Sequence, residues 1–489
     1  MMKKSFLFLR LLPLIALIAT ISCRKDDLIS NDTSITLSFS TDSVVFDTVF
    51  TSIGTVTKRL MVYNSSNKRI NISNIQLGLA EASVFRVNVD GVSGLNINNI
   101  EVAAKDSVFI LVKATIDPRD ESNPYVVEDD LIFLTNGNQQ KVKLVAWGQD
   151  ANYIIADQVV GNFPKFRIVA DSNETVVWTS EKPYVVYGYA LINSYGTLII
   201  EAGTKVHFHD KSGLWAYVDG VLKVQGTLEN PVTFQGDRLD QEYKDIPGQW
   251  DRIWLMEGRS GFNHEIDHAI IRNGYIGIQV ESFLRATSNQ LSISNTVIEN
   301  HSGIGIFSRL FAIDASNVVV ANCGNYAAAF TAGGAYRFRH CTLANQWNYS
   351  VRNTPSLFFN NFLLDSLDKP IPIPINLDFS NSIIYGSNED ELERELVGGA
   401  DTTYLFDHCF IKLSDSWKSN TAFETSYFNE DPLFKDYALF NYEPDTLSPV
   451  IGKGKPEISA EIPFDLNGVS RLTSSDIGAF QYVPDPEEE

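Results

Sequence analysis

The chain has 489 residues and a formal net charge of −21, from 39 basic and 60 acidic residues. A hydrophobic fraction of 44% with 11% aromatic residues excludes a disordered protein, and the length allows two or more domains. The acidic balance disfavours nucleic acid and anionic lipid surfaces as partners, because both are bound through patches of Lys and Arg. It also disfavours a polyanionic polysaccharide, unless basic residues gather locally.

The first 22 residues have the features of a secretory signal. Lys3 and Lys4 give a positive start, residues 6–21 are largely apolar, and the apolar run ends at Cys23. The four residues TISC that end at Cys23 resemble a lipobox, the sequence at which a bacterial lipoprotein is cleaved and lipidated on its new N-terminal cysteine. The resemblance implies an acyl anchor such as palmitate on Cys23. The alternative is an ordinary secretory signal with an incidental cysteine.

A short tether, residues 23–33, follows the expected cleavage point after residues 1–22. Its charged start, RKDD, resembles the Lys-acidic-acidic signal that sends Bacteroidota lipoproteins to the outer face of the outer membrane. The resemblance implies a lipid-anchored, cell-surface protein; the alternative is a solvated, charged tether. Removal of the signal takes away three basic residues and changes the net charge from −21 to −24. No later stretch has the ~20 apolar residues needed to span a membrane.

Residues 34–151 show the alternating pattern of antiparallel strands, as in ITLSF, SVVFDTVF and SVFILVKATI. About seven such strands, separated by Asn, Gly, Pro and Asp, predict an Ig-like β-sandwich. The Cys…Trp…Cys core of antibody domains is missing, so an antibody-type domain is not implied. We expect this domain to act as a spacer. Residues 152–173 are expected to be a linker to the next domain or a cap on its first strands.

Residues 174–430 contain a repeat. Six segments share a third residue that is Asn or His, followed by a small or polar residue and an apolar pair. These third residues are His268, Asn295, Asn317, His340, Asn381 and His408. They are separated by steps of 27, 22, 23, 41 and 27 residues, and the step of 41 includes an insertion over about 347–376.

A β-rich unit of this length cannot bury its own apolar face, but stacked copies can. We expect the Asn and His positions to form a structural ladder at a bend, where side chains bond from coil to coil. Asn tolerates the left-handed backbone conformation that such a bend requires. Parallel coils about 4.8 Å apart would then share one core.

The pattern resembles the right-handed parallel β-helix of pectate-lyase-like proteins, together with GTLIIEAGTKVHF and GVLKVQGTLENPVTFQG upstream and DLNGVSRLTSSDIGAFQY near the end. The resemblance covers roughly residues 171–482. It implies a closing segment at 431–482, with an acidic, disordered tail at 483–489. The predicted fold is therefore all-β, an N-terminal Ig-like sandwich followed by a right-handed parallel β-helix.

The fold does not decide between a binding protein and an enzyme. Polysaccharide lyases need a base and a cation, and glycoside hydrolases need two carboxylates roughly 5 to 9.5 Å apart. The richest cluster of polar candidates for catalysis consists of Asp251, Arg252, His264, Asp267 and Arg272. The competing interpretation is that these residues are surface ion partners. A calcium ion is expected only if the protein is a lyase, and no other cofactor is implied.

Five aromatic residues are candidates for stacking on sugar rings: Trp215, Tyr217, Trp250, Trp254 and Trp347. Each is otherwise a core or coil-edge residue. The insertion is the best candidate for a loop beside a groove, since long loops carry function more often than coils do. His207 and His209, with Asp210 next to them, could place two imidazoles on one face, but no third metal ligand is apparent, so no metal site is predicted. Cys323, Cys341 and Cys409 are expected to be buried thiols without disulfides.

Two classes of function remain open. The favoured one is a non-catalytic surface lipoprotein that serves glycan binding, adhesion or a structural role, with extracellular glycan and the outer membrane as partners. The alternative is a polysaccharide lyase or glycoside hydrolase that acts on extracellular glycans. A monomer is expected in both cases.

Overall fold

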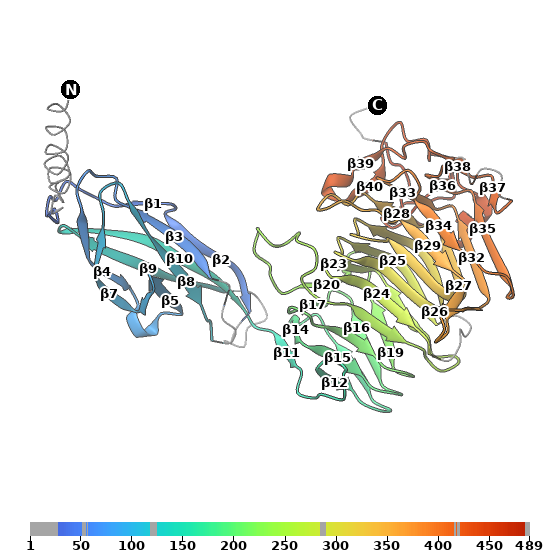
Figure 1. Cartoon of the computed structure of the whole chain (residues 1–489), viewed down its shortest axis with the longest axis horizontal. Helices are drawn as coiled ribbons and strands as arrows, with labels where there is room; N and C mark the ends of the chain where they lie inside the picture. The colour runs from blue at the N-terminus through green and yellow to red at the C-terminus, as the bar shows by residue number, and fades with distance from the viewer. Residues whose placement is uncertain are drawn as a thin grey trace, which may run out of the picture. The chain divides into compact units, whose positions relative to one another are not determined.

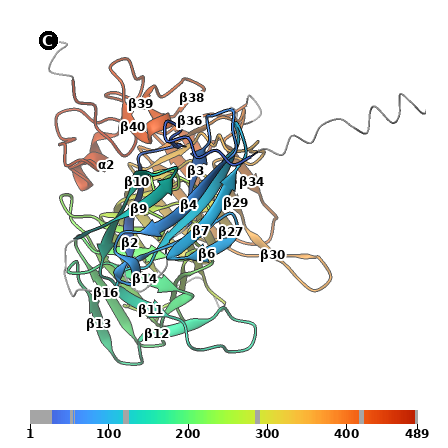
Figure 2. The same cartoon turned by 90° about the vertical axis from the view of Figure 1, so that its left-hand side faces the viewer.

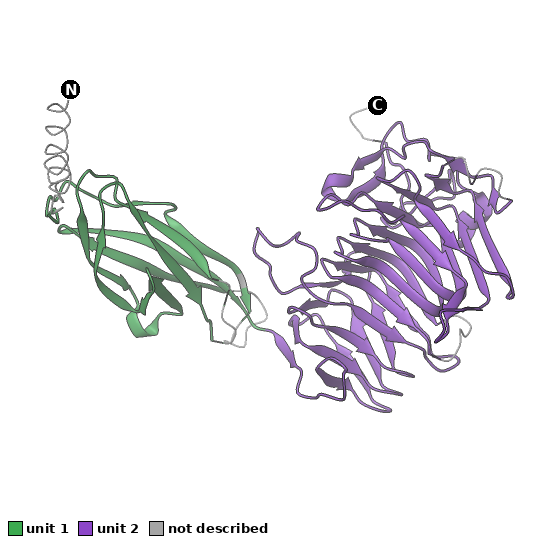
Figure 3. Cartoon of the chain, viewed as in Figure 1, with its two compact units in different colours: residues 1–150 green, residues 151–489 purple. Residues whose placement is uncertain are grey.

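The computed structural model describes residues 28–50, 55, 57–117, 125–283, 290–414, 417 and 421–484. The chain divides into two compact units, residues 1–150 and 151–489 (Figure 3). The predicted signal, Cys23 and the RKDD sequence lie outside the described residues. Within the described ranges, no helix has both the length and the apolar character to cross a membrane.

Unit 1 is a sandwich of two five-stranded sheets. The first sheet has the order β1(Ser38–Phe39), β3(Lys58–Tyr63), β8(Ser107–Ala114), β5(Phe85–Val89), β6(Val92–Gly94). The second has the order β2(Ser43–Phe50), β10(Asn138–Gln149), β9(Tyr125–Thr135), β4(Ile70–Leu77), β7(Asn96–Val102). The neighbours in each are antiparallel, except that β2 runs parallel to β10. A short 3-10 turn, η1(Ala80–Ala82), precedes β5.

The alternation of buried and exposed residues along each strand explains why the sandwich forms. In β8, Val108, Ile110, Val112 and Ala114 are buried, while the residues between them are at least partly exposed. Residues two apart lie on one face of a strand, so each strand of this kind contributes one apolar row to the shared core. The sandwich expected from the sequence is confirmed, with ten strands where about seven were predicted.

Unit 2 is a parallel β-helix in which most strands pair with the third strand after them, so that each coil has three faces. The first face contains β11(Asn152–Ile155), β14(Tyr184–Tyr187), β17(Lys205–Phe208), β20(Val232–Gly236), β23(Ala269–Arg272), the end of β25(Leu291–Glu299), the end of β26(Ile304–Ala321), β28(Thr342–Asn345), β33(Ile383–Gly386), β36(Phe410–Ile411) and β38(Tyr427–Phe428). Its parallel arrows stack coil on coil in Figure 1.

The second face contains β12(Phe166–Ala170), β15(Tyr189–Ile192), β18(Gly213–Ala216), β21(Ile253–Met256), β24(Ile276–Glu281), the starts of β26 and β27(Ala328–Arg339), β29(Leu357–Asn360) and β34(Leu392–Glu395). The third contains β13(Thr175–Trp178), β16(Thr197–Glu201), β19(Val221–Gln225), β22(His264–Asp267), the start of β25, the middle of β26, the end of β27, β32(Ile375–Ser380), β35(Thr402–Asp407) and β37(Phe423–Glu424). The apolar residues that point inward from all three faces form one continuous core. The predicted fold class, an all-β sandwich followed by a parallel β-helix, is confirmed.

Two segments take different places from those expected. Residues 152–173, expected as a linker or cap, already form the first coil, because β11 and β12 pair in parallel with β14 and β15. In the insertion, β29 is a regular strand of the second face, and only the hairpin of β30(Phe362–Leu364) and β31(Pro370–Pro372) projects from the coil.

The C-terminal segment, residues 431–482, was expected to close the end of the helix. It contains β39(Phe434–Asp436), η3(Tyr437–Leu439), β40(Asn441–Pro444) and α2(Pro456–Glu461) (Figure 2). It packs along the first face: Tyr442, Leu466 and Ala479 form an apolar cluster with Val319 and Ala344 of the coils. The segment therefore runs back over the side of the coil stack, because apolar residues on the outside of that face need a cover.

Candidate functional site

The predicted ladder residues occupy one corner, between the third and first faces. All six have φ between 47° and 52°. Strand pairing places each ladder residue beside the one in the next coil. Asn295 lies beside Asn317, for example, because the residues on either side of them pair: Ser294 with Ser316, and Thr296 with Val318. Thr425, with φ 45°, adds a seventh position that the sequence pattern missed. A left-handed residue turns the chain sharply within one position, and this explains why Asn and His recur there.

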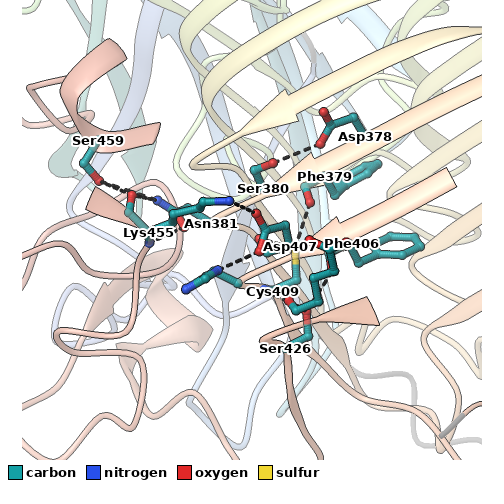
Figure 4. A network of polar contacts seen from close by, with 12 residues as sticks. Asp378, Phe379, Ser380, Asn381, Phe406, Asp407, Cys409, Ser426, Lys455 and Ser459 are labelled. Atoms are coloured by element: carbon teal, nitrogen blue, oxygen red, sulfur yellow. Dashed lines mark hydrogen bonds and ion pairs between the residues drawn. The ribbon is translucent and has the colours of Figure 1, made fainter. Parts of the chain in front are cut away.

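The ladder also holds the C-terminal segment. Asn317 Nδ2 donates to Asn295 Oδ1 at 2.9 Å, and Asn381 Nδ2 lies 3.0 Å from His340 Nε2. Figure 4 shows Asn381 beside Lys455, whose ammonium donates to Asp407 at 2.6 Å. These contacts mark the corner as a structural feature.

The five candidates for catalysis do not come together. Asp251 and Arg252 form an ion pair at 2.8 Å beside the second face, and Asp251 also accepts a hydrogen bond from Tyr189. Asp267 lies at the ladder corner, where it accepts bonds from the side chains of the next coil. Arg272 is the last residue of β23, on the outside of the first face.

His264, the fifth candidate, is completely buried in the helix. Its Nδ1 accepts from the Leu222 N–H at 3.2 Å, and its Nε2 lies 2.9 Å from the carbonyl oxygen of Met256. Burial lowers its pKa to about 4. His301 repeats this arrangement with Gly274 and Ile271, so both imidazoles are neutral structural residues.

Most of the aromatic candidates are unavailable for stacking on a sugar. Trp215, Trp250 and Trp347 are 2%, 1% and 9% exposed. Trp254 stacks on Trp215 with 4.8 Å between ring centroids, and its N–H donates to Glu281. Tyr217, at 37% exposed, is the most exposed of the five, and its ring packs edge-on against Trp215.

Of the histidines considered for a metal, His207 is buried with its Nδ1 3.2 Å from the Gly236 carbonyl oxygen, and His209 pairs with Asp237 at 2.8 Å. In the parts of the chain that the structure describes, no three carboxylate, imidazole or thiol groups lie close enough together to hold a metal ion. The described cysteines, Cys323, Cys341 and Cys409, are buried free thiols.

A second asparagine ladder, which the sequence interpretation missed, stands at the end of the first face. Asn322 Nδ2 donates to Asn300 Oδ1, and Asn300 Nδ2 donates to Asn273 Oδ1, each at 2.8 Å. All three have positive φ. Each comes five positions after a first-ladder residue, and this constant spacing was the available signal.

The second ladder fixes the loop between β20 and β21, residues 237–249. Asn273 Nδ2 donates to the Lys244 carbonyl oxygen at 2.6 Å, and Asn300 Nδ2 to that of Asp245 at 2.7 Å. The hydroxyl of Tyr349 donates to the same Asp245 carbonyl at 2.8 Å. Side chains from three different coils thus hold one loop against the outside of the first face.

A pocket of about 400 Å³ lies between this loop, the residues after β28 and the C-terminal segment. We call it the polar pocket. It is lined by Lys244, Asp245, Arg272, Asn322, Gln346, Asn348, Tyr349, Tyr437, Ala438, Leu439 and Phe440. Tyr349 and Tyr437 are 51% and 52% exposed, so they offer open rings beside amide and charged groups.

Glu299 lies next to Arg272, its neighbour across β23 and β25. The Arg272 guanidinium donates Nε and Nη2 to Gln235 Oε1 at 3.0 and 2.9 Å. Burial raises the pKa of Glu299 to about 7; the charge of Arg272 opposes this rise and that of Asp245 adds to it. Glu299 does not line the polar pocket and is 8% exposed, so it lies behind Arg272 and not on the pocket surface. A carboxyl group that changes protonation near neutral pH beside an arginine is a candidate functional group.

No protein-family model matches the chain, and no curated protein matches it. Among solved structures, it is similar to the Agl-KA catalytic domain at 11% identity and a TM-score of 0.28, over 77% of this chain and 80% of that chain. A family 123 glycoside hydrolase from Clostridium perfringens shares 4% identity at a TM-score of 0.18, over 24% of this chain and 30% of that one. A protein of unknown function from Porphyromonas gingivalis W83 shares 12% identity at a TM-score of 0.18, over 28% and 58%. The chain thus spans less than a third of the family 123 enzyme. Structural similarity at these TM-scores indicates nothing about the activity of this chain.

Proposed function

We propose that this protein is a surface-exposed lipoprotein of the outer membrane, anchored through Cys23, whose β-helix binds an extracellular glycan without catalysis. The pectate-lyase-like, right-handed character of the helix and the Bacteroidota type of lipoprotein belong to this proposal. Unit 1 serves as the spacer. The observation that supports glycan binding is the polar pocket, where two open tyrosine rings meet amides and an arginine.

These groups suit a sugar chain. A sugar ring presents an apolar face that stacks on an aromatic ring, and a belt of hydroxyls that bond to amides and guanidinium groups. Asn322, Gln346 and Asn348 supply both donors and acceptors around the pocket. Sites of this kind combine a concave shape with a few convergent polar groups.

Binding is tested with the purified segment of residues 24–489 on an array of bacterial and plant glycans, followed by calorimetry with each glycan that binds. Tyr437→Ala removes an open ring from the pocket and is expected to weaken binding at least tenfold. Tyr63→Ala is the matched control, because Tyr63, 38% exposed on β3 of unit 1, does not line the pocket. Equal affinities for the two variants would contradict this placement, and no binding at all would contradict the function.

A second candidate, a glycoside hydrolase, is favoured by one observation. Burial raises the pKa of Glu299 to about 7, and Asp245 stands close enough for its charge to add to that rise. In such a reaction Glu299 gives its proton to the glycosidic oxygen as that bond breaks. Asp245 takes a proton from the water whose oxygen bonds to the sugar.

The two candidates are separated by incubating each bound glycan with the protein and measuring new reducing ends. Binding without new ends supports the non-catalytic function. New ends that disappear in Glu299→Gln, with binding retained, support the hydrolase. An unsaturated product would instead indicate a lyase, since elimination leaves a double bond.

The anchor is tested in cells. Incorporation of an alkyne-tagged fatty acid into the wild-type chain, and its loss in Cys23→Ala, are the expected results. Proteolysis of the protein on intact cells tests exposure on the outer face. Labelling that persists in Cys23→Ala would contradict the assigned lipidation site.

A further inference from the structure

The lining of the polar pocket differs in charge from the chain as a whole. It contains two cations, Lys244 and Arg272, and one carboxylate, Asp245. The full chain, by contrast, has 39 basic and 60 acidic residues. The Asp245 carboxylate lies 3.9 Å from the ammonium of Lys244, so the single carboxylate of the lining is already beside a cation. This leaves the charge of Arg272 to be accounted for.

The Arg272 guanidinium uses only part of its hydrogen-bonding capacity. Of its five N–H groups, one on Nε and one on Nη2 donate to Gln235 Oε1, so three remain. Two of these, one on each Nη, point in parallel from the end of the planar group. Among the described residues, Arg272 has no ion pair with a carboxylate. The side chain is half-buried and lines the pocket, so a ligand there can reach it.

The carboxyl group of Glu299, across the strand pair from Arg272, neutralises this charge only in part. Burial raises the pKa of Glu299 to about 7, so many molecules carry this group uncharged at neutral pH. The guanidinium therefore retains a positive charge in a partly buried place. A charged donor there attracts an anion more strongly than a fully solvated donor does, because less water screens the attraction.

We propose that the polar pocket recognises an acidic sugar, one that carries a carboxylate or a sulfate group, within an otherwise neutral glycan. The acid group accepts the two parallel hydrogen bonds from the end of the Arg272 guanidinium, and Lys244 adds a second positive charge. The rings of Tyr349 and Tyr437 stack on the adjoining sugar. This assignment rests on the proposed glycan binding and specifies its chemical class. A densely charged polymer is disfavoured, because the net charge of −21 repels it outside the pocket.

The test uses cellotriose, its analogue with glucuronate as the non-reducing unit, and its analogue with a sulfate on carbon 6 of that unit. Calorimetry on residues 24–489 is expected to give at least tenfold tighter binding of one acidic analogue than of cellotriose, and the tighter analogue identifies the acid group. Arg272→Gln is expected to bring this ratio close to one. Lys244→Gln, at a 47% exposed side chain, is expected to reduce it several-fold, and it decides the test if Arg272→Gln does not fold. Arg69→Gln is the control, because it removes the same charge from a partly exposed side chain of unit 1, and it should leave the ratio unchanged.

Equal or tighter binding of cellotriose, abolished by Tyr437→Ala, would overturn the acidic assignment and leave glycan binding in the pocket intact. A preference for an acidic analogue that survives Arg272→Gln unchanged would overturn the role of the guanidinium. If none of the three binds, the tightest acidic glycan of the array and its carboxyl-reduced or desulfated form replace them in the same comparison. An array with only neutral ligands overturns the assignment while the proposed function stands, and an array without ligands overturns both. Thermal unfolding of each variant verifies that its fold is retained.

Discussion

Asn381 and Lys455 exchange two hydrogen bonds across 74 residues of sequence. Asn381 Nδ2 donates to the Lys455 carbonyl oxygen at 3.0 Å, and the Lys455 N–H donates back to Asn381 Oδ1 at 2.7 Å. One side chain of the first ladder therefore joins the coil stack to the C-terminal segment. Because residues 437–440 of that segment line the polar pocket, the ladder supports the proposed site from a distance.

Replacement of Asn381 by Ala is expected to lower the free energy of unfolding of unit 2 by about 3 kcal/mol. The change removes buried hydrogen bonds and places an ordinary side chain in a left-handed conformation. Thermal unfolding measures the effect. Asn173→Ala is the control, since Asn173 has φ 63° and an exposed side chain, and it isolates the backbone contribution. Equal losses in both variants would show that the Asn381 contacts contribute nothing.

Asn300→Asp is expected to release the loop that carries Lys244. The amide donates to Asn273 and to the Asp245 carbonyl oxygen, and a carboxylate can donate neither bond. Faster tryptic cleavage after Lys244 is the expected result. Asn325→Asp, at an exposed position nearby, is expected to cleave at the wild-type rate. An unchanged rate in Asn300→Asp would contradict the role of the second ladder.

Glu299 is expected to make stability depend on pH. Its pKa rises from 4.5 to about 7 on folding, so the folded state binds the proton more tightly. The stability that this proton contributes is complete below pH 4.5 and is lost as the pH rises through 7. Relative to Glu299→Gln, the wild type should lose up to about 3 kcal/mol between about pH 5 and about pH 8.5. Parallel stability curves for the two proteins would refute the raised pKa.

Arg352 and Glu391 form a fully buried ion pair, with 2.5 Å between Nη2 and Oε1. Glu391 also accepts from the N–H groups of Ser356 and Asn388, at 2.8 and 2.7 Å. Arg352→Met should lower the free energy of unfolding by about 3 to 5 kcal/mol, because it leaves a buried carboxylate without its cation. The double variant Arg352→Met/Glu391→Leu is expected to recover part of the loss. A single variant as stable as the wild type would contradict this account.

The sequence predicted the features that depend on local chemistry. Six Asn and His residues at coil spacing indicated a corner with left-handed backbone, and alternating strands indicated the sandwich. The path of residues 431–482 was not predictable in this way, because it depends on the apolar outer surface around Val319 and Ala344, which no periodicity reveals.

The candidate site was predicted only in part. Arg272 appeared among the candidates, but Glu299 and Tyr437 did not. Strand register brings Glu299 beside Arg272 across 27 residues, and the C-terminal segment brings Tyr437 to the same pocket across 165 residues. The sequence had placed Asp267 and His264 in the same polar cluster as Arg272. In the three-sided coil, Asp267 lies at a corner and His264 points into the interior.

The one-residue corner between the third and first faces has a consequence for engineering. A bend made by a single left-handed residue cannot accommodate an added residue without a change of register. Such an insertion would move every later side chain of the strand to the opposite face of the sheet. The hairpin of β30 and β31 has no such constraint: Leu364 and Leu367 near its tip are 57% and 72% exposed. Foreign peptides should therefore be grafted at residues 364–369, where extra length leaves the coil register unchanged.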